Sequence, residues 1–246
     1  IKYKLKRIKL QMLALTKVMT TALLLTSGVV SASTNKTITE VLGESPEWNE
    51  EMFKALLARH DLNHLLLSDV TALIAHLRTE FPEIIKVKSI GRTVQDRDML
   101  MIEINARDFI LNKLGDVGST IRQKLDPVMP AIMLTGAHHA RELLSVQMPI
   151  YSILRLLHGG IIHNDEKYQN LLIQNKYYVM PVTNVDGLAD IEQHFEKTGE
   201  WLTRRKNMNF AGTEDGDCAS GYEERGVDIN RNYGVDWDKS WNGGNS

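Results

Sequence analysis

The sequence predicts an α/β fold built around a largely parallel β-sheet. Short apolar runs that suit buried strands alternate with longer segments whose apolar residues recur at helical spacing, and this alternation is typical of such sheets. With 246 residues, of which 43% are hydrophobic and 24% are charged, the chain can bury one large core or two small ones. The composition therefore excludes wholesale disorder.

The N-terminus has the features of a secretory signal peptide. Residues 1–17 carry six basic side chains and no acidic one, and residues 18–35 are uncharged and contain small residues around Ala32. We expect cleavage near Ala32 or Ser33, which makes residues 1–33 the signal peptide and the mature protein secreted or periplasmic. A membrane anchor competes with this interpretation, because the uncharged run approaches the roughly 20 residues that span a bilayer. No stable membrane insertion is expected after cleavage.

Charge and cysteine content narrow the classes of function. Of the 29 basic residues, six lie in residues 1–17, which leaves 23 against 31 acidic residues. A chain with this acidic excess is not expected to bind nucleic acid, which needs a basic surface. The single cysteine, Cys218, excludes an internal disulfide framework and a cysteine-rich zinc module.

The first expected elements precede the sheet. Residues 34–58 are predicted to form a short leader, too small for a domain, with one helical stretch at about 47–59. A longer helix is predicted from Ser68, which can cap it, to about Glu80, and Pro82 stops it.

Two short strands are predicted next, at 85–90 and 99–105. Gly91 and a charged turn at 96–98 join them. The following segment, 106–128, is expected to be loop-like or weakly helical.

The second half of the chain contains the more apolar elements. They are a buried strand at 131–135, a helix with a broad apolar face at 143–157, a second buried strand at 177–182 and a helix at 188–203. In sheets of this kind, functional side chains gather at the carboxyl ends of the strands. The segments after Thr135 and Val182 are therefore the first places to search for a site.

The segment GAHHARE at 136–142 follows the first of these buried strands. His139 and Glu142 are three residues apart on a tight turn, so an imidazole nitrogen and a carboxylate can converge on one cation. A second His-x-x-Glu, at 163–166, lies in a polar loop without a strand before it, and we interpret it as surface. His138 is expected to pack or bond locally.

Three further polar segments stand out in the sequence. MPVTNVDG at 180–187 is interpreted as a turn that ends a strand and shapes a site. RRKN at 204–207 is a basic group in an acidic chain, and a solvated helix end explains it about as well as a site does. GVDINRNY at 226–233 is typical of an anion-recognition loop.

Taken in order, GAHHARE, MPVTNVDG, RRKN and GVDINRNY resemble the carboxypeptidase A-type zinc metallocarboxypeptidases, or funnelins, over about residues 60–240. The resemblance implies an α/β domain with a mixed, mainly parallel sheet flanked by helices. It also implies Zn²⁺ as the cofactor, peptide or protein C-termini as substrates, and zinc-assisted hydrolysis that removes one C-terminal residue.

The resemblance implies part of a metal site. His139 and Glu142 match two of the zinc ligands, and Asp228 matches the carboxylate that accepts the free ring N–H of the ligand histidine. A catalytic zinc needs three protein ligands and a water, but the sequence offers neither the family's later histidine ligand nor its general-base glutamate. Residues 59–246 are therefore expected to be the N-terminal part of a truncated catalytic domain that is inactive alone.

The resemblance also implies substrate contacts. Arg205 matches the arginine that stabilises the oxyanion, although the neighbouring Arg204 stays open as the alternative. Asn230 and Arg231 match the pair that binds the terminal carboxylate, and Arg141 matches a further substrate-side arginine. Two other functions remain: a non-catalytic carboxylate-binding relative, and a zinc amidase that acts on isopeptide or cell-wall peptides.

Overall fold

The computed structural model describes residues 64–210 and 225–234. The predicted signal peptide at 1–33, the leader at 34–58 with its helical stretch, and Cys218 all lie outside these ranges. Within them, no helix has the length and apolar character needed to cross a bilayer.

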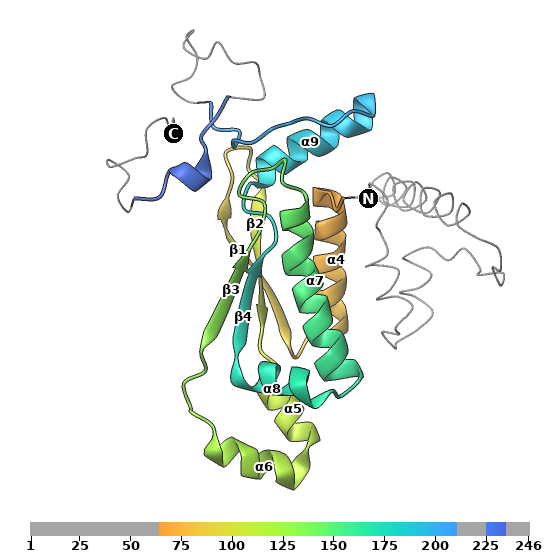
Figure 1. Cartoon of the computed structure of the whole chain (residues 1–246), viewed down its shortest axis with the longest axis vertical. Helices are drawn as coiled ribbons and strands as arrows, with labels where there is room; N and C mark the ends of the chain where they lie inside the picture. The colour runs from red at the N-terminus through yellow and green to blue at the C-terminus, as the bar shows by residue number, and fades with distance from the viewer. Residues whose placement is uncertain (1–63, 211–224, 235–246) are drawn as a thin grey trace, which may run out of the picture. The chain divides into compact units, whose positions relative to one another are not determined.

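The sheet is mixed, as the resemblance implies. Its described strands are β1 Ile85–Arg92, β2 Asp98–Ile104, β3 Ala131–Thr135 and β4 Lys176–Met180, in the order β1-β2-β4-β3 (Figure 1). β2 pairs antiparallel with both β1 and β4, whereas β3 and β4 are parallel. The chain between β3 and β4 runs through helices, as a parallel pair requires.

β4 lies in the buried part of this sheet. Val179 pairs with Ile102 of β2 and with Leu134 of β3, and Val179 and Ile102 are both 0% exposed. β3 forms at the predicted residues, but Ile132 and Met133 are 39% and 59% exposed. The prediction that β3 is buried was wrong, because in the described part of the chain this strand has a neighbour on one side only.

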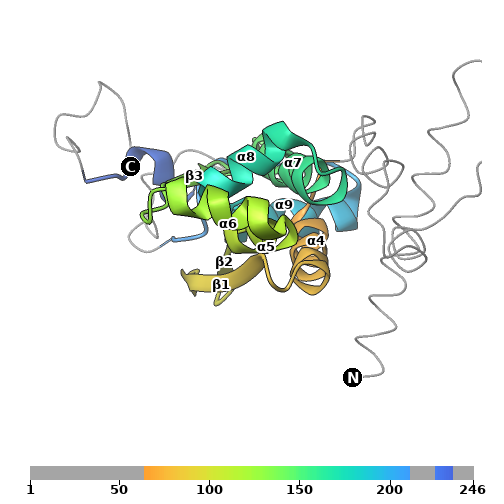
Figure 2. The ribbon, with the colours of Figure 1, turned by 90° about the horizontal axis from the view of Figure 1, so that it is seen from below.

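Two long helices cover one face of the sheet. α4 Leu67–Glu80 and α7 Leu144–Leu157 run along the strands, and two views place both on the same side (Figure 1, Figure 2). The buried residues of α4 recur at helical spacing: Val70, Leu73, Ile74 and Leu77. α7 has the broad apolar face expected from the sequence.

α4 begins one residue before the predicted start and uses a different cap. Leu66 is the N-cap residue, and its N–H donates to the Asp69 carboxylate at 3.1 Å. Ser68 lies inside the first turn, where its N–H lies 3.3 Å from both carboxylate oxygens of Glu192. The prediction that Ser68 caps this helix was therefore wrong, because acidic side chains accept hydrogen bonds from the N–H groups of the first turn instead.

Two helices occupy the segment that was expected to be loop-like or weakly helical. α5 Arg107–Lys113 and α6 Gly115–Lys124 lie at the end of the sheet away from the carboxyl ends of β3 and β4 (Figure 1). A Cβ at Gly118 would lie 1.9 Å from the carbonyl oxygen of Leu111. The glycine that lowers helix propensity is thus the residue that lets the two helices pack.

α7 continues directly into a π-helical turn, His158–Ile162. The His163 N–H donates to the His158 carbonyl at 3.0 Å, which is the i to i+5 bond of a π turn. α8 Glu166–Gln174 follows and is capped by Asp165.

α9 Val185–Thr198 begins three residues before the predicted start and ends before the predicted 203. Asn184 caps it by accepting the Gly187 N–H at 3.0 Å. The helix ends at Gly199, whose φ of +77° is a left-handed conformation that glycine adopts without strain.

Asp186 ties the start of α9 to the connection between β1 and β2. Its buried carboxylate accepts hydrogen bonds from Thr93 Oγ1 at 2.7 Å, from the Gln95 N–H at 3.0 Å and from Arg97 Nη1 at 2.8 Å. The turn between these strands is therefore held at the end of the sheet where β3 and β4 finish (Figure 1).

Candidate functional site

The turn after β3 holds the first predicted motif in a strained conformation. A Cβ at Gly136 would lie 2.2 Å from the Ser145 carbonyl oxygen, so only glycine fits there. Ala137 adopts a φ of +47°, a region that costs a non-glycine residue roughly 1–2 kcal/mol. The Ser145 hydroxyl holds this conformation by accepting the Ala137 N–H at 2.9 Å.

His139 lies between two carboxylates. Its Nδ1 is 2.7 Å from Glu142 Oε1, and its Nε2 is 3.1 Å from Asp228 Oδ1. His139 and Asp228 are buried, whereas the Glu142 side chain is 51% exposed. The imidazole is therefore fixed from the protein side by Asp228 and faces the more open Glu142 with its other nitrogen.

Asp228 also binds Arg205. Arg205 Nε donates to Asp228 Oδ2 at 2.7 Å, and Arg205 Nη1 lies 3.8 Å from Glu142 Oε1. Burial acts to raise the pKa of Asp228, but hydrogen bonds from Arg205 and His139 outweigh it, and the pKa lies below its ordinary value. Asp228 is therefore ionised at neutral pH and orients both neighbours.

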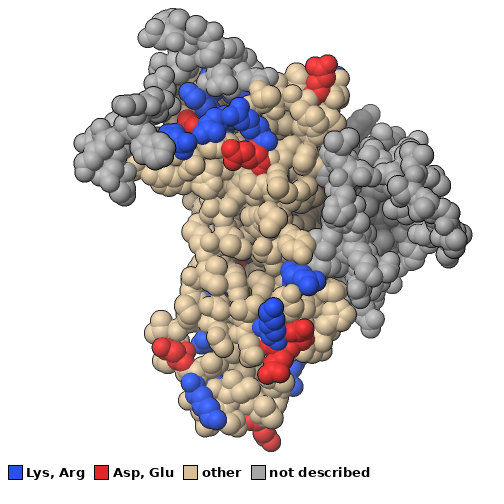
Figure 3. Space-filling model, viewed as in Figure 1, with Lys and Arg blue, Asp and Glu red and all other residues tan. Residues whose placement is uncertain are grey.

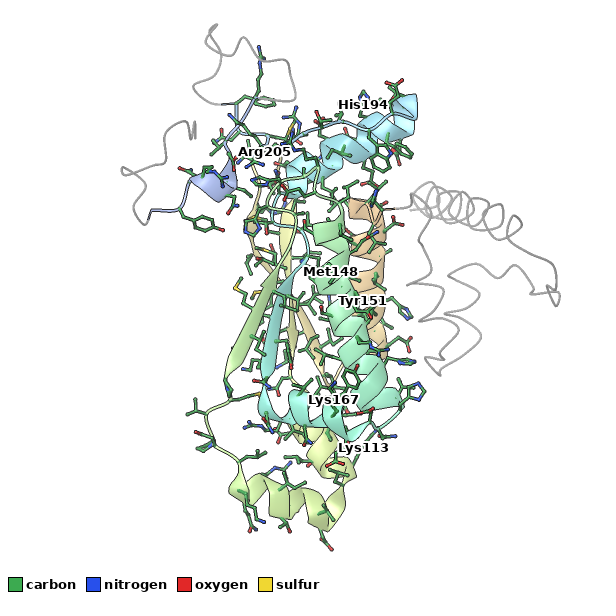
Figure 4. The ribbon with its side chains drawn as sticks, viewed as in Figure 1. Lys113, Met148, Tyr151, Lys167, His194 and Arg205 are labelled. Atoms are coloured by element: carbon green, nitrogen blue, oxygen red, sulfur yellow. The ribbon has the colours of Figure 1, made fainter. Side chains whose placement is uncertain are left out.

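Backbone pairing brings Arg205 to this place. The Ala140 N–H donates to the Arg205 carbonyl at 3.4 Å, and the Arg141 N–H donates to the Arg204 carbonyl at 2.8 Å. Arg204 is fully buried and forms an ion pair with Asp190 of α9. Of the two arginines, it is Arg205 that reaches the carboxylates on either side of His139. Lys and Arg side chains gather at this end of the molecule in Figure 3, where Figure 4 labels Arg205.

Asn184 connects the two segments that form the site. Its Nδ2 lies 3.4 Å from the His138 carbonyl and 3.3 Å from the Arg205 carbonyl, while its Oδ1 caps α9. The residue is 3% exposed. The turn at 180–187 therefore shapes the site through one buried amide.

The three predicted substrate-binding residues lie beside this cluster. Asp228 begins a 3-10 turn, Ile229–Arg231, and its Oδ1 accepts the Asn230 N–H at 3.0 Å. Arg231 is exposed and donates to the Asn230 carbonyl. Arg141 donates to the Thr203 carbonyl at 3.3 Å. Among the described residues, no hydrogen bond or ion pair joins these three side chains to His139.

His138 has a partner that the sequence did not indicate. Its Nε2 lies 3.1 Å from the Tyr233 hydroxyl oxygen, and their ring centroids are 6.5 Å apart. Tyr233 belongs to the third polar segment and is 59% exposed. The local bonding expected for His138 is therefore a contact between two motifs that are distant in the sequence.

A groove of about 790 Å³ opens next to Glu142. Its lining from the end of β3 and the start of α7 includes Thr135, Arg141, Glu142, Leu144, Ser145 and Met148. Leu144 and Met148 are 64% and 52% exposed, and Figure 4 labels Met148 on α7. The groove is therefore apolar along the helix and charged at the end that faces the histidine.

The donor set suits a zinc ion after one small adjustment. An imidazole nitrogen and a carboxylate oxygen converge, and Asp228 orients the ring from its other nitrogen. Two atoms bound about 2.0–2.1 Å from a tetrahedral ion lie about 3.3 Å apart, so the Glu142 carboxylate must withdraw slightly from His139. No group of three His, Cys, Asp or Glu residues within 64–210 and 225–234 could hold a metal ion, so His139 and Glu142 would account for two of the three protein ligands that a catalytic zinc needs.

The sheet, the turn after β3 and the His139–Glu142 pair together have the arrangement of a metal-binding site at the carboxyl end of a strand in an α/β protein. Residues 70–246 match the family model described as zinc carboxypeptidase. The chain belongs to the zinc carboxypeptidase family, whose cofactor is Zn²⁺.

Individual relatives agree with this assignment. Carboxypeptidase B of Astacus astacus is 27% identical over 171 residues, which are 70% of this chain and 45% of the relative. The inactive metallocarboxypeptidase ECM14 of Saccharomyces cerevisiae is 26% identical over 165 residues, 67% of this chain and 31% of the relative. The crystal structure of thrombin activatable fibrinolysis inhibitor shares the fold, with a TM-score of 0.51 and 20% identity over 80% of this chain and 39% of that chain. The chain thus spans less than half the length of these relatives.

Proposed function

We propose that this protein is a secreted or periplasmic zinc metallocarboxypeptidase that hydrolyses the C-terminal bond of peptides and proteins. The observation that carries the proposal is the position of His139 between Glu142 and Asp228, in a chain of the zinc carboxypeptidase family. In this proposal residues 1–33 are the export signal, residues 34–58 a leader and residues 59–246 part of the catalytic domain.

The cluster around His139 supplies the reaction centre. His139 and Glu142 would hold the zinc ion, and the bound ion would supply an activated water molecule and polarise the scissile carbonyl. Asp228 accepts the Nε2–H of His139 and so keeps Nδ1 free for the metal. Because Asp228 fixes Arg205 through Nε, the terminal nitrogens of Arg205 face the Glu142 side and stabilise the negative charge that develops on the carbonyl oxygen.

Asn230 and Arg231 bind the substrate's terminal carboxylate, and Arg141 is a further contact on the substrate side. All three residues are exposed beside the cluster, and a guanidinium group suits bidentate binding of a carboxylate. This contact restricts the enzyme to chain ends. Since the described residues supply only two metal ligands, we expect the 246-residue chain alone to bind zinc weakly and to have little activity.

Matched peptides test the carboxylate contact. We would measure fluorescence anisotropy of two labelled peptides, one with a free C-terminus and one amidated, against the zinc-loaded full chain. The free carboxylate is expected to bind at least about tenfold more tightly, which corresponds to roughly 1.4 kcal/mol. Arg231→Ala should remove this preference, whereas the exposed Arg122→Ala on α6 should keep it. Equal binding of the two peptides to the unmodified chain would overturn the proposal.

A second candidate is a non-catalytic carboxylate-binding protein. It is favoured by the two-ligand metal site of the described residues, and a relative of this chain is itself named as inactive. Mass spectrometry of the same peptides after incubation with excess zinc separates the candidates. Release of one C-terminal residue supports the carboxypeptidase, and carboxylate-dependent binding without release supports the second candidate.

A further inference from the structure

Another pair of histidines lies at the opposite end of α7 from the His139 cluster. His158 and His163 flank the π turn, and their Nε2 atoms are 3.1 Å apart. The ring centroids are 4.3 Å apart and the ring planes are inclined by 74°. His158 is 6% exposed, whereas His163 is exposed. One imidazole is therefore fixed by its surroundings, and the other is open to solvent.

The π turn is the reason that these two side chains meet. Residues five apart on an α-helix do not lie one above the other, because the helix has 3.6 residues per turn. Here the bond from the His163 N–H to the His158 carbonyl closes a wider turn at 3.0 Å. Gly159 permits this turn, since a Cβ would lie 2.3 Å from the Tyr168 ring. The packing of α8 thus holds the pair together without any metal.

The spacing of the two nitrogens, rather than the orientation of the rings, suits a shared ion. An in-line N–H···N bond would place each ring centre behind its own nitrogen, so the centroids would be much further apart than the nitrogens. The observed centroids are 4.3 Å apart for nitrogens 3.1 Å apart, so the two rings are not both in line with the nitrogen–nitrogen direction, and they must turn before both nitrogens point at one ion. A tetrahedral ion about 2.0–2.1 Å from each nitrogen would hold them about 3.3 Å apart, within a few tenths of an ångström of the observed spacing.

We propose that His158 and His163 form an auxiliary site for a divalent transition-metal ion of the zinc, nickel and copper group. Imidazole nitrogen is the ligand that these ions share, and water completes their coordination. The site lies outside the proposed catalytic cluster and does not depend on the proposed function. By joining the end of α7 to the segment before α8, a bound ion stabilises this junction.

The surrounding charges affect how tightly the site binds a cation, and the ligand atoms determine which cations it binds. Arg155 and Lys167 lie 5.7 Å and 5.9 Å from the centroid of the Tyr168 ring at the same junction, and their positive charge weakens the binding of any cation. The nearby Asp165 carboxylate accepts N–H groups at the start of α8. Because the two ligands are nitrogens, Ca²⁺ and Mg²⁺, which require several oxygens, are not expected to bind.

Zinc titration of the tag-free full chain tests the site. Isothermal titration would compare Glu142→Gln, which removes a ligand of the proposed catalytic zinc, with the same variant that also carries His163→Ala. A matched control adds His194→Ala, a partly exposed histidine on α9 (Figure 4). Zinc affinity is expected to fall at least about tenfold with His163→Ala, a loss that even outer partners of metal sites produce, and to stay unchanged with His194→Ala. Equal affinities with and without His163 would overturn the proposal.

Thermal melting provides an independent measurement. Zinc is expected to raise the melting temperature of the Glu142→Gln chain and to leave that of the His163→Ala double variant unchanged, because an ion that binds only the folded state stabilises it. His163 is exposed, so its replacement should not change the metal-free melting temperature. A rise of the same size with Ca²⁺ would contradict the imidazole site. Failure of the peptide test at Arg231 would leave these results untouched, so the two proposals can fail separately.

Discussion

Replacing Asn184 with alanine is expected to destabilise the domain more than the loss of one helix cap would. The Asn184 side chain caps α9 through Gly187 and donates to the carbonyls of His138 and Arg205. It is 3% exposed, so water does not readily take over these contacts. One substitution therefore removes the amide that joins the turn after β3, the start of α9 and the Arg205 segment.

The magnitude follows from the separate contacts. Loss of an N-cap costs about 1 kcal/mol. Each buried carbonyl that loses its donor costs roughly 1 kcal/mol, at the low end of the usual range because both Asn184 bonds are long. The Arg205 carbonyl keeps the Ala140 N–H, which reduces its share. Together these give about 2–3 kcal/mol, a large part of the roughly 5–15 kcal/mol that stabilises an ordinary domain.

Urea denaturation followed by circular dichroism measures this loss. Asn184→Asp is the informative companion, because it keeps the capping oxygen but turns a second oxygen toward the two carbonyls, and it should be at least as unstable as Asn184→Ala. Asn175→Ala, which removes an exposed bond to the Leu171 carbonyl, serves as the control and should cost less than about 1 kcal/mol. The reasoning is refuted if Asn184→Ala stays within about 0.5 kcal/mol of the unmodified chain, or if Asn184→Asp is as stable as that chain.

Three further predictions concern strain, metal binding and pH. Ala137→Gly is expected to raise the free energy of unfolding by up to about 1 kcal/mol, since glycine adopts a φ of +47° without steric cost; a loss of stability in urea denaturation would contradict it. Asp228→Asn is expected to weaken zinc binding about 10- to 100-fold by removing the carboxylate that orients His139, and unchanged affinity in isothermal titration would exclude that role. Burial raises the pKa of Glu192, so the folded state binds a proton at this carboxyl more tightly than the unfolded state does. The protonated carboxyl therefore contributes to stability at low pH, and this contribution is lost as the pH rises through the folded pKa. Glu192→Gln removes the titration, so its stability relative to the unmodified chain should increase between about pH 4 and about pH 7, and parallel pH profiles would contradict this.

The sequence predicted those elements whose structure is determined by their own apolar pattern. The strand at 131–135 has the predicted bounds, and α7 begins within one residue of its predicted start. The predictions failed where a contact between residues distant in the sequence determines the local structure. α6 forms because Gly118 packs on Leu111 of α5, and Ser68 gives up its capping role because Glu192 of another helix faces its N–H.

The candidate site shows the same division. His139 and Glu142 could be found because they share one short turn after a strand, while Asp228 and Arg205 were indicated only by family resemblance. The burial of Arg204 could not be predicted, since arginine is rarely fully buried and its partner Asp190 belongs to a different segment. For Asn184 a signal did exist, because asparagine is one of the residues preferred at the N-cap position of a helix.

The charges around His139 have a thermodynamic consequence for ligand binding. Glu142, Asp228 and Arg205 together carry a net charge of −1, which a divalent ion would change to +1. A peptide carboxylate therefore meets a more favourable potential once the ion is bound, and by linkage the carboxylate must increase the affinity for the ion by the same factor. Metal and substrate occupancy are thus mutually dependent, so a peptide with a free C-terminus should shift zinc binding to lower zinc concentrations more than its amidated twin does.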